Sequence, residues 1–186
     1  MLKIAIAGNI ASGKSTVEEI LKNKKFKVYD TDKIAHEILE ASDDIKVLFK
    51  DYDITTDGKI DRRKLANIVF SDKQLLKMLE SVIHPKVKEE ILKIFEQDFD
   101  TVFISVPQLF EAGFEDLFDK IIFVTAKKEV RLKRLMKRNN LTHEEALKRI
   151  ESQLSDEFKI KKSDIIIENN GTIEELNALT EKNLLI

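Results

Sequence analysis

Residues 8–15 read Gly-Asn-Ile-Ala-Ser-Gly-Lys-Ser, which is a G-x-x-x-x-G-K-S pattern. Residues 2–7 before it have the length and branching of a buried strand. Val17, Ile20 and Leu21 then recur at helical spacing, which predicts an amphipathic helix. Strand, loop and helix in this order favour a phosphate-binding loop over a glycine turn that a lysine follows by chance.

Each part of this loop suits the binding of a nucleotide. Successive backbone N–H groups and the positive end of the helix form a cradle for phosphate oxygens. Lys14 would place a charge at the β- and γ-phosphates, Ser15 would offer its hydroxyl to Mg²⁺, and Thr16 would stand beside the phosphates. The predicted nucleotide-binding residues here are Gly8, Ala11, Ser12, Gly13, Lys14, Ser15 and Thr16.

The loop predicts what is bound but not the reaction, because kinases, switches and mechanical ATPases share it. A chain of 186 residues suits one domain, residues 1–186, with a sizeable core. The net charge of −2 argues against a dedicated nucleic-acid-coating protein. No stretch has transmembrane length and the chain enters its first strand at once, so we expect no membrane association and a cytoplasmic location.

Strand-like runs alternate with helical runs along the chain. After the first strand, they lie at 26–29, 101–106, 121–124 and 165–167. This order is typical of an α/β fold in which helices flank a five-stranded parallel sheet on both faces.

Helix starts and one long insertion complete the predicted organisation. Three starts have capping-box spacing, at Ser71 with Gln74, Thr142 with Glu145, and Thr172 with Glu175. The insertion, 33–97, is far longer than one crossover needs, so we predict a helical subdomain there. His84 and Pro85 are predicted to end one of its helices and start the next.

A segment of the insertion resembles the front of an EF-hand calcium loop. If Asp53 is the first position, Lys64 is the twelfth, so a cation replaces the bidentate carboxylate that completes a calcium shell. We therefore interpret Asp57–Gly58 as a tight turn and Asp61 as the cap of a helix that begins at Arg62.

Two carboxylates, Asp30 and Asp32, follow the second predicted strand. Ligands of open parallel sheets bind at the carboxyl ends of the strands, where Asp32 could orient and deprotonate an attacking hydroxyl. The alternative is that these residues cap the helix that carries Ile34 and Ile38. The two roles can also coexist.

Arginines are candidates for phosphate contacts on both sides of the predicted crevice. They are Arg62 and Arg63 in the insertion, and Arg131, Arg134 and Arg138 at helical spacing after the fourth strand. Guanidinium groups suit bidentate phosphate contact and the stabilisation of a transferring phosphoryl group. Arg138 stands at the hinge of a short predicted lid, 138–156. For each arginine, a surface ion pair is the alternative.

Taken together, the motifs resemble the dephospho-CoA kinase family over nearly the whole chain. Beyond the phosphate loop, the resemblance rests on the order and spacing of Tyr29–Ala35, Asp57–Leu65 with Val69–Ser71, His84–Pro85, Val106–Glu111, Arg134–Arg138 and Ser163–Gly171. The resemblance implies a three-layer phosphate-loop kinase fold, with the insertion 33–97 as the acceptor-binding part and a short lid.

The resemblance also implies a reaction and roles for single residues. It implies transfer of the γ-phosphoryl group of ATP, with Mg²⁺, to the 3′-hydroxyl of dephospho-CoA, the last step of CoA synthesis. Lys14 would then be catalytic, Asp32 would face the ribose hydroxyl, and Arg138 would close on the phosphates. The acceptor would contact Arg62, Arg63 and His84 in the insertion, and Asn170 and Gly171 would pass near the adenine of ATP.

Some positions depart from the family pattern. Asn9 and Ala11 stand where glycines are common, and Ala11 requires a backbone free of glycine-only torsions. Arg131 stands where glutamine is frequent. Ser105 stands where many phosphate-loop enzymes have a carboxylate at a strand end, so the predicted Mg²⁺ site lacks a direct second carboxylate. Mg²⁺ could instead be held through waters by Asp30, Asp32 or Glu111, because it keeps much of its hydration shell.

Two other functions stay open. The nearer alternative is another small-molecule kinase of this architecture, with a nucleotide or a sugar acid as acceptor. The more distant one is a nucleotide-dependent switch, although the N-K-x-D segment by which guanine-specific switches read their base is absent. We expect dephospho-CoA as the partner, no nucleic acid, and a monomer.

Overall fold

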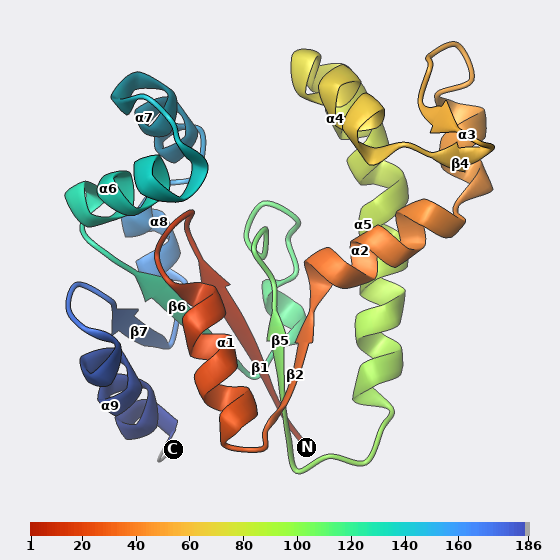
Figure 1. The fold of residues 1–186 in the computed structure, drawn as a ribbon. Helices are drawn as coiled ribbons and strands as arrows, with labels where there is room; N and C mark the ends of the chain where they lie inside the picture. Colours follow the sequence, from red (N-terminus) through yellow and green to blue (C-terminus); the bar gives the residue numbers. More distant parts are fainter. Residues whose placement is uncertain (185–186) are drawn as a thin grey trace. The chain divides into compact units, whose positions relative to one another are not determined.

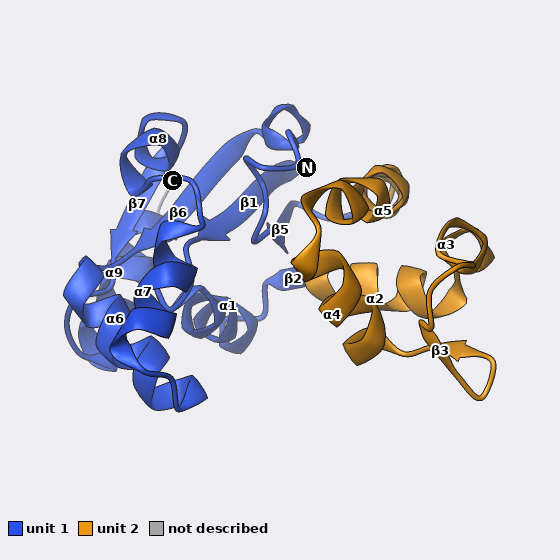
Figure 2. Cartoon of the chain, turned by 90° about the horizontal axis from the view of Figure 1, so that it is seen from above, with its two compact units in different colours: residues 1–30, 98–186 blue, residues 31–97 orange. Residues whose placement is uncertain are grey.

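The computed structural model describes residues 1–184, which form two compact units (Figure 2). The first, the sheet unit, consists of Met1–Asp30 and the chain from Asp98 onward. The second, the helical unit, is Thr31–Gln97.

The sheet unit is built on one five-stranded parallel sheet (Figure 1). Its strand order is β2-β5-β1-β6-β7. The strands are β1 (Leu2–Gly8), β2 (Lys27–Asp30), β5 (Thr101–Ser105), β6 (Lys120–Thr125) and β7 (Ile165–Glu168). The predicted parallel sheet is confirmed, and no predicted strand end differs from the observed one by more than one residue.

One face of the sheet packs against α1 (Lys14–Asn23) and α9 (Ile173–Leu184). Alternate residues of the strands point to this face because side chains of a strand alternate between its two sides. The core between the two layers contains Ile4, Ile6, Val17, Leu21, Phe103, Ile122, Val124, Ile165, Ile167 and Leu176, all buried. Burial of these side chains fixes α1, and therefore the loop before it, on the sheet.

The other face is covered by the chain between β5 and β6, which includes the short helix η1 (Glu115–Leu117), and by α8 (Asp156–Lys161). The ring of Phe110 packs edge-on against Phe123 of β6, with ring centroids 6.4 Å apart, and against Phe158 of α8 at 6.3 Å. Both faces of the sheet are thus buried, as expected for parallel strands.

Two further helices, α6 (Lys128–Asn139) and α7 (His143–Glu151), follow β6. They share a small apolar cluster of Leu135, Ala146 and Ile150. The predicted capping box of Thr142 and Glu145 is confirmed at the start of α7. The predicted box at the start of α9 is confirmed by reciprocal bonds between Thr172 and Glu175.

The strand ends bring several loops to one edge of the sheet. Ser105, the last residue of β5, pairs with Ile6 of β1 on one side and with Asp30 of β2 on the other. Gly8 pairs with Val124 of β6. Strand β1 is the central strand, with β5 on one side and β6 on the other. Ligands of such sheets bind where the strand order reverses, which is where the loop after β1 lies.

The helical unit contains four helices and a hairpin. They are α2 (Thr31–Ala41), α3 (Asp43–Leu48), β3 (Thr55–Thr56), β4 (Lys59–Ile60), α4 (Arg62–Ser71) and α5 (Lys73–Phe95). Helices α2, α3 and α4 all pack against α5. The buried side chains of α5 are Ile83, Val87, Ile91 and Ile94, which recur at helical spacing.

The local predictions around the hairpin are confirmed. Asp57 and Gly58 have φ angles of 50° and 74°, which makes the tight turn between β3 and β4. The side chain of Asp61 accepts hydrogen bonds from the backbone of Arg63 and Lys64, as a helix cap does. Lys64 Nζ lies 2.9 Å from both carboxylate oxygens of Asp53, so a cation occupies the front of the calcium-like segment.

Two predicted helix boundaries in this unit are wrong. Helix α5 continues through Pro85 without a break, because its buried stripe on both sides of the proline outweighs the loss of one backbone hydrogen bond. Ser71 is the last residue of α4 and donates to the carbonyl of Ile68. Asp72 caps α5 instead, by accepting a bond from Gln74 N at 2.7 Å.

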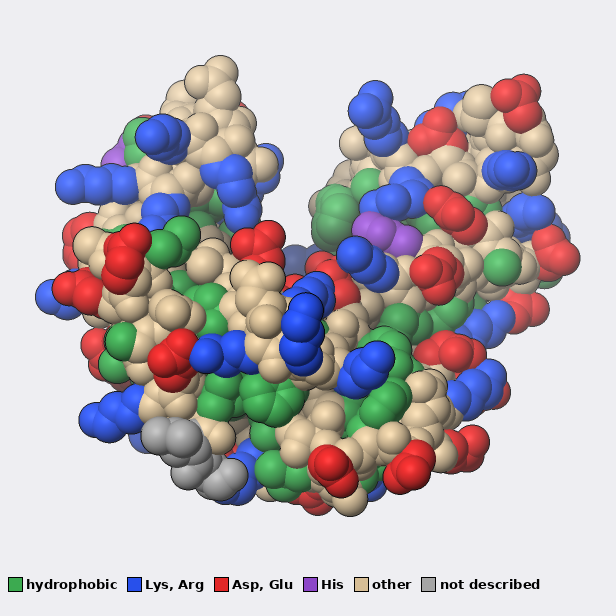
Figure 3. Space-filling view, turned by 60° about the horizontal axis from the view of Figure 1, so that its bottom comes forward, with side chains coloured by type: hydrophobic (Ala, Val, Ile, Leu, Met, Phe, Trp, Pro, Cys, Tyr) green, Lys and Arg blue, Asp and Glu red, His purple; other side chains and the backbone are tan. Residues whose placement is uncertain are grey.

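Charged side chains of both signs are interspersed over the face that Figure 3 shows. This agrees with 32 basic and 34 acidic residues in the sequence. Within residues 1–184, no helix combines the length and the apolar character that crossing a membrane requires.

Pro85 provides a test of the continuous α5. We expect Pro85→Ala to raise the free energy of unfolding by about 1–2 kcal/mol, since it restores a backbone donor inside a helix, and the Tm by about 2–8 °C. Lys88→Ala, at another exposed position of the same helix, is the control and should leave the Tm nearly unchanged. A lower Tm for Pro85→Ala in thermal unfolding would contradict the account.

Candidate active site

The loop between β1 and α1 needs glycine at two positions. Gly13 has φ of 99°, and a Cβ there would lie 2.0 Å from Asn169 Nδ2. A Cβ on Gly8 would lie 2.9 Å from the carbonyl oxygen of Val124. Side chains at these positions would therefore clash, which explains both glycines of the pattern.

Ala11 adopts a left-handed backbone, with φ of 60°. This region favours glycine but is open to a residue with a Cβ, so the requirement for a backbone free of glycine-only torsions is met. Such a torsion costs a residue with a Cβ about 1–2 kcal/mol. The methyl group of Ala11 packs against the apolar cluster of α6 and α7, which offsets part of that cost.

The start of α1 suits an anion. The first N–H groups of any helix lack partners inside the helix, and no side chain caps α1 at Gly13. Ser12 is buried, and its hydroxyl has no partner within the part of the chain that the structure describes. A phosphate group would supply acceptors for such donors, so these residues fit the phosphates of a nucleotide.

Lys14 lies at the centre of a cluster of polar side chains at the end of β5. Its Nζ donates to Glu18 Oε1 at 2.7 Å and to the hydroxyl of Ser105. Ser105 in turn donates to Glu18 Oε1 at 2.6 Å. Glu18 and Ser105 are both buried, so these contacts lie under the phosphate loop and not on its surface.

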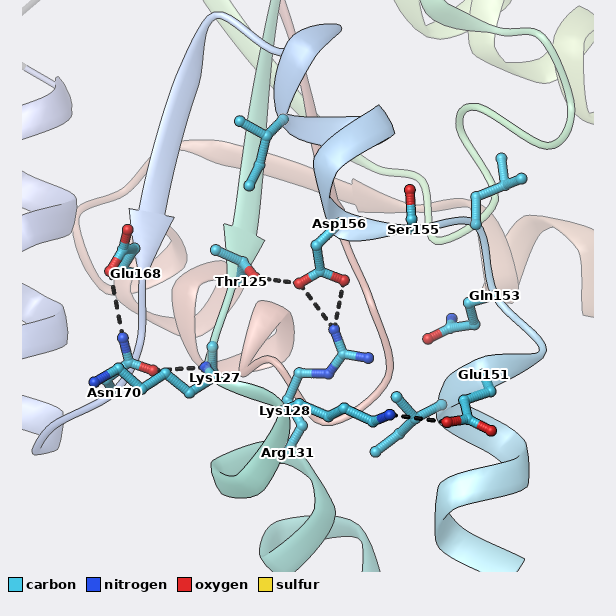
Figure 4. Close-up of a pocket in the computed structure, with 14 residues that line it drawn as sticks. Thr125, Lys127, Lys128, Arg131, Glu151, Gln153, Ser155, Asp156, Glu168 and Asn170 are labelled. Atoms are coloured by element: carbon cyan, nitrogen blue, oxygen red, sulfur yellow. Dashed lines mark hydrogen bonds and ion pairs between the residues drawn. The ribbon is translucent and has the colours of Figure 1, made fainter.

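A second polar cluster supports the loop from the side of α8 (Figure 4). Asp156 accepts two bonds from Arg131 Nη1, at 2.7 and 2.9 Å, and one from Thr125 Oγ1 at 2.6 Å. It also accepts a bond of 2.5 Å from the side-chain amide of Asn9 in the phosphate loop. The cluster borders a pocket of about 670 Å³ whose rim includes Lys128, paired with Glu151.

Lys159 of α8 extends this cluster. Its side chain is only 1% exposed, and its Nζ donates to Asn9 Oδ1 and to Glu111 Oε1, each at 2.7 Å. Asn9 therefore uses its amide nitrogen toward Asp156 and its amide oxygen toward Lys159. The orientation of Asn9 is fixed at both ends.

The charge of Asp156 depends on these partners. Burial alone would raise its pKa, but the hydrogen bonds from Thr125 and Arg131 and the positive charge of Arg131 outweigh burial. The pKa of Asp156 is consequently lower than that of an ordinary carboxyl group. Asp156 stays ionised at neutral pH and balances the buried guanidinium of Arg131.

Two more side chains complete the hydrogen bonds of the loop. Gln153 Oε1 accepts from the backbone N–H of Ile10 at 2.8 Å. Asn169, just after β7, donates to the carbonyl of Ser12 at 2.8 Å and accepts from Arg134 Nη2 at 3.3 Å. Side chains from the α7–α8 connection and from the chain after β7 thus bind the loop directly, and α6 contributes through Asn169.

Comparison with known proteins gives the same family over the whole chain. The dephospho-CoA kinase family model matches residues 2–175. A dephospho-CoA kinase from Fusobacterium nucleatum subsp. nucleatum is 44% identical over 183 residues, 96% of this chain and 95% of that protein. The chain belongs to the dephospho-CoA kinase family.

Solved structures agree with this assignment. A protein from Thermus thermophilus has a TM-score of 0.87 and 37% identity, with 99% of this chain and 96% of that chain covered. A dephospho-CoA kinase from Campylobacter jejuni has a TM-score of 0.77 and 35% identity, with 98% and 95% covered. The predicted resemblance, the phosphate-loop kinase fold and the class of ATP-dependent kinases are confirmed.

The other predicted residues of the sheet unit lie around the loop. Thr16 is in the first turn of α1. Arg138 is exposed in the last turn of α6, and its Nε donates to Asn139 Oδ1 at 2.9 Å. Asn170 accepts from the backbone N–H of Lys127 at 2.7 Å, and Gly171 follows it. Asn169, just after β7, contacts the phosphate loop through the carbonyl of Ser12.

In the helical unit, the structure brings Arg62 and Arg63 together at one groove of about 640 Å³. Arg62 Nη2 contacts His36 Nε2, and the other lining residues are mostly apolar side chains of α2, α4 and α5. Asp32 lies in the first turn of α2. His84 lies on α5, one residue before Pro85, and is not among the residues that line the groove.

Several residues of the site were not predicted to act there. Asn9 was visible only as a departure from the family pattern. Arg131 was predicted as a candidate phosphate contact, with a surface ion pair as the alternative, and the structure shows it buried and paired with Asp156, which Asn9 also contacts. Glu18 follows Lys14 by four residues, a spacing that places two side chains on one side of a helix. No local sequence pattern indicated Asp156 or Lys159, because the residues that they contact are distant in the sequence.

The cluster around Asp156 leads to a prediction on stability. Asp156→Asn leaves the buried Arg131 without its counter-charge, so we expect a loss on the order of 3 kcal/mol at pH 7. Because folding lowers the pKa of Asp156, its contribution is present above the ordinary carboxyl pKa of about 3.9 and disappears as pH falls through the lowered value. The difference between wild type and Asp156→Asn should therefore shrink below about pH 4.

Denaturant unfolding at several pH values measures this difference. Glu157→Gln, at the exposed neighbouring position of α8, is the matched control and should behave as wild type. Equal stability of Asp156→Asn and wild type at pH 7 would show that the cluster does not support the fold.

Proposed function

We propose that this chain transfers the γ-phosphoryl group of ATP to the 3′-hydroxyl of dephospho-CoA, giving CoA and ADP. The observation that carries the proposal is the family match over residues 2–175 together with an uncapped phosphate loop. We place the reaction in the cytoplasm, where CoA synthesis has its ATP, and expect a monomer. Residues 33–97 would hold the acceptor, and residues 138–156 would form the lid.

The phosphate loop would bind the nucleotide with backbone N–H groups from Ala11 to Thr16. Gly8 and Gly13 give it the necessary backbone path, and the buried hydroxyl of Ser12 has no hydrogen-bond partner in the described chain. Lys14 would leave Glu18 and Ser105 to contact the β- and γ-phosphates. Asn170 and Gly171 would lie near the adenine.

The loop also fits Mg²⁺ beside the phosphates. Ser15 is exposed in the first turn of α1, where its hydroxyl is available as the ligand that phosphate-loop enzymes use. When bound, Mg²⁺ would neutralise charge on the phosphate oxygens. Ser15 and the loop would keep those oxygens in place for the transfer.

The acceptor side of the reaction would use residues of the helical unit. Arg62, Arg63 and His84 would contact the phosphorylated acceptor, with the apolar groove beside the two arginines available to its less polar parts. Asp32 would accept the proton of the 3′-hydroxyl as a bond forms between that oxygen and the γ-phosphorus. The bond from the γ-phosphorus to the β-phosphate bridge oxygen breaks, and ADP leaves.

The lid would exclude water from this transfer. Arg138 lies where α6 ends, before Asn140 with its left-handed φ of 50°, and the hinge would lie at this turn. Closure would bring the Arg138 guanidinium to the phosphates, where it stabilises the charge of the transition state. Without closure, water could take the phosphoryl group in place of the acceptor.

ADP release with Mg-ATP tests the proposal directly. We expect release that depends on dephospho-CoA and stays at background with nucleoside monophosphates, with shikimate or gluconate, or without an acceptor. Equal release without any acceptor would indicate a nucleotide-dependent switch. Release only with another acceptor would assign the chain to a different kinase reaction.

Two substitutions separate phosphate binding from base catalysis. We expect Asp32→Asn to lower kcat by about 100-fold or more, the usual contribution of a general base, while the affinity for ATP changes only a few-fold. Lys14→Ala should weaken nucleotide binding more than Asp32→Asn does, because it removes a charge at the phosphates. Steady-state kinetics and calorimetric titration with ATP measure both effects, and near-normal kcat for Asp32→Asn would exclude the base.

A further inference from the structure

The end of β5 has no carboxylate of its own at the position where many phosphate-loop enzymes place one for their Mg²⁺ site. Ser105 stands there, paired with Ile6 of the strand that leads into the phosphate loop. A carboxylate is nevertheless present at this point. Glu18 Oε1 lies 2.6 Å from Ser105 Oγ, so α1 delivers to the end of β5 the group that β5 lacks.

The place of Glu18 on α1 is unusual for a charged residue. Its neighbours Val17 and Leu21 are fully buried in the core, and the Glu18 side chain is only 8% exposed. Burial of a carboxylate costs free energy unless partners compensate for it. Lys14 and Ser105 are the partners that compensate for it here, so the buried side of α1 carries a carboxylate in direct contact with the phosphate-binding lysine.

The geometry of α1 relates Glu18 to the phosphate site. Residues three and four apart lie on the same side of a helix. Ser15, the proposed Mg²⁺ ligand, precedes Glu18 by three residues, and Lys14 precedes it by four. Lys14 Nζ contacts Glu18 Oε1 at 2.7 Å. One turn of α1 therefore carries the phosphate-binding cation, the metal-binding hydroxyl and a carboxylate.

We propose that Glu18 is the carboxylate of the Mg²⁺ site in this chain. In the absence of nucleotide it holds Lys14. With nucleotide present, Lys14 moves to the phosphates, and the freed Glu18 carboxylate accepts hydrogen bonds from water ligands of the Mg²⁺ that Ser15 contacts, because Mg²⁺ keeps most of its hydration shell. This inference rests on the proposed use of Mg-ATP.

Calorimetric titration with ATP, with excess Mg²⁺ and with EDTA, tests the inference without any acceptor. Mg²⁺ raises the affinity of the protein for ATP, and we expect this increase to be about tenfold smaller in Glu18→Gln than in wild type. Removal of an outer partner of a metal site has an effect of this size. In EDTA, its affinity should equal or exceed that of wild type, because Lys14 no longer has to leave a carboxylate. Glu19→Gln, at the exposed next position of α1, is the control and should match wild type.

A second variant moves the carboxylate from α1 to β5. Glu18→Gln with Ser105→Asp should restore the Mg²⁺ contribution to ATP affinity and should also correct any folding defect of the single variant. Equal loss of affinity with Mg²⁺ and with EDTA, or no rescue by Ser105→Asp in a folded protein, would show that Glu18 serves only the structure. Dephospho-CoA takes no part in these titrations. A negative result would therefore count against the role of Glu18 and not against the proposed reaction.

Discussion

The phosphate loop keeps its shape because side chains from outside it complete its hydrogen bonds. Asn9 is held between Asp156 and Lys159, Ile10 by Gln153, and the carbonyl of Ser12 by Asn169. A loop with a left-handed alanine and few internal bonds would otherwise sample many conformations before it met a nucleotide. These contacts fix the donors in advance, so binding a nucleotide requires little further ordering.

Three departures from the family pattern, Asn9, Arg131 and Ser105, each bind a carboxylate. Asn9 and Arg131 both bind Asp156, so the polar side chain in the loop and the charged one on α6 share a single counter-charge. Ser105 and Glu18 are joined in the same way at the end of β5. A polar residue that would be costly if buried alone is tolerated because a second one satisfies it.

Much of the fold follows from local patterns in the sequence. The five strands, the turn at Asp57–Gly58 and the cap at Asp61 depend on neighbouring residues, and these predictions are confirmed. Pro85 and Ser71 were misinterpreted because local propensity competes with tertiary packing and with a better cap one residue away. The supports of the phosphate loop join residues about 150 positions apart, so no local pattern could predict them.

The proposed reaction transfers the phosphoryl group to one particular hydroxyl group, the 3′-hydroxyl of the ribose. Phosphorus–proton correlation NMR of the product formed from Mg-ATP and dephospho-CoA tests it most directly, because it identifies the ribose carbon that bears the new phosphate. We expect coupling of the new phosphorus signal to the ribose H3′. Coupling to H2′, or a new signal only from inorganic phosphate, would contradict it.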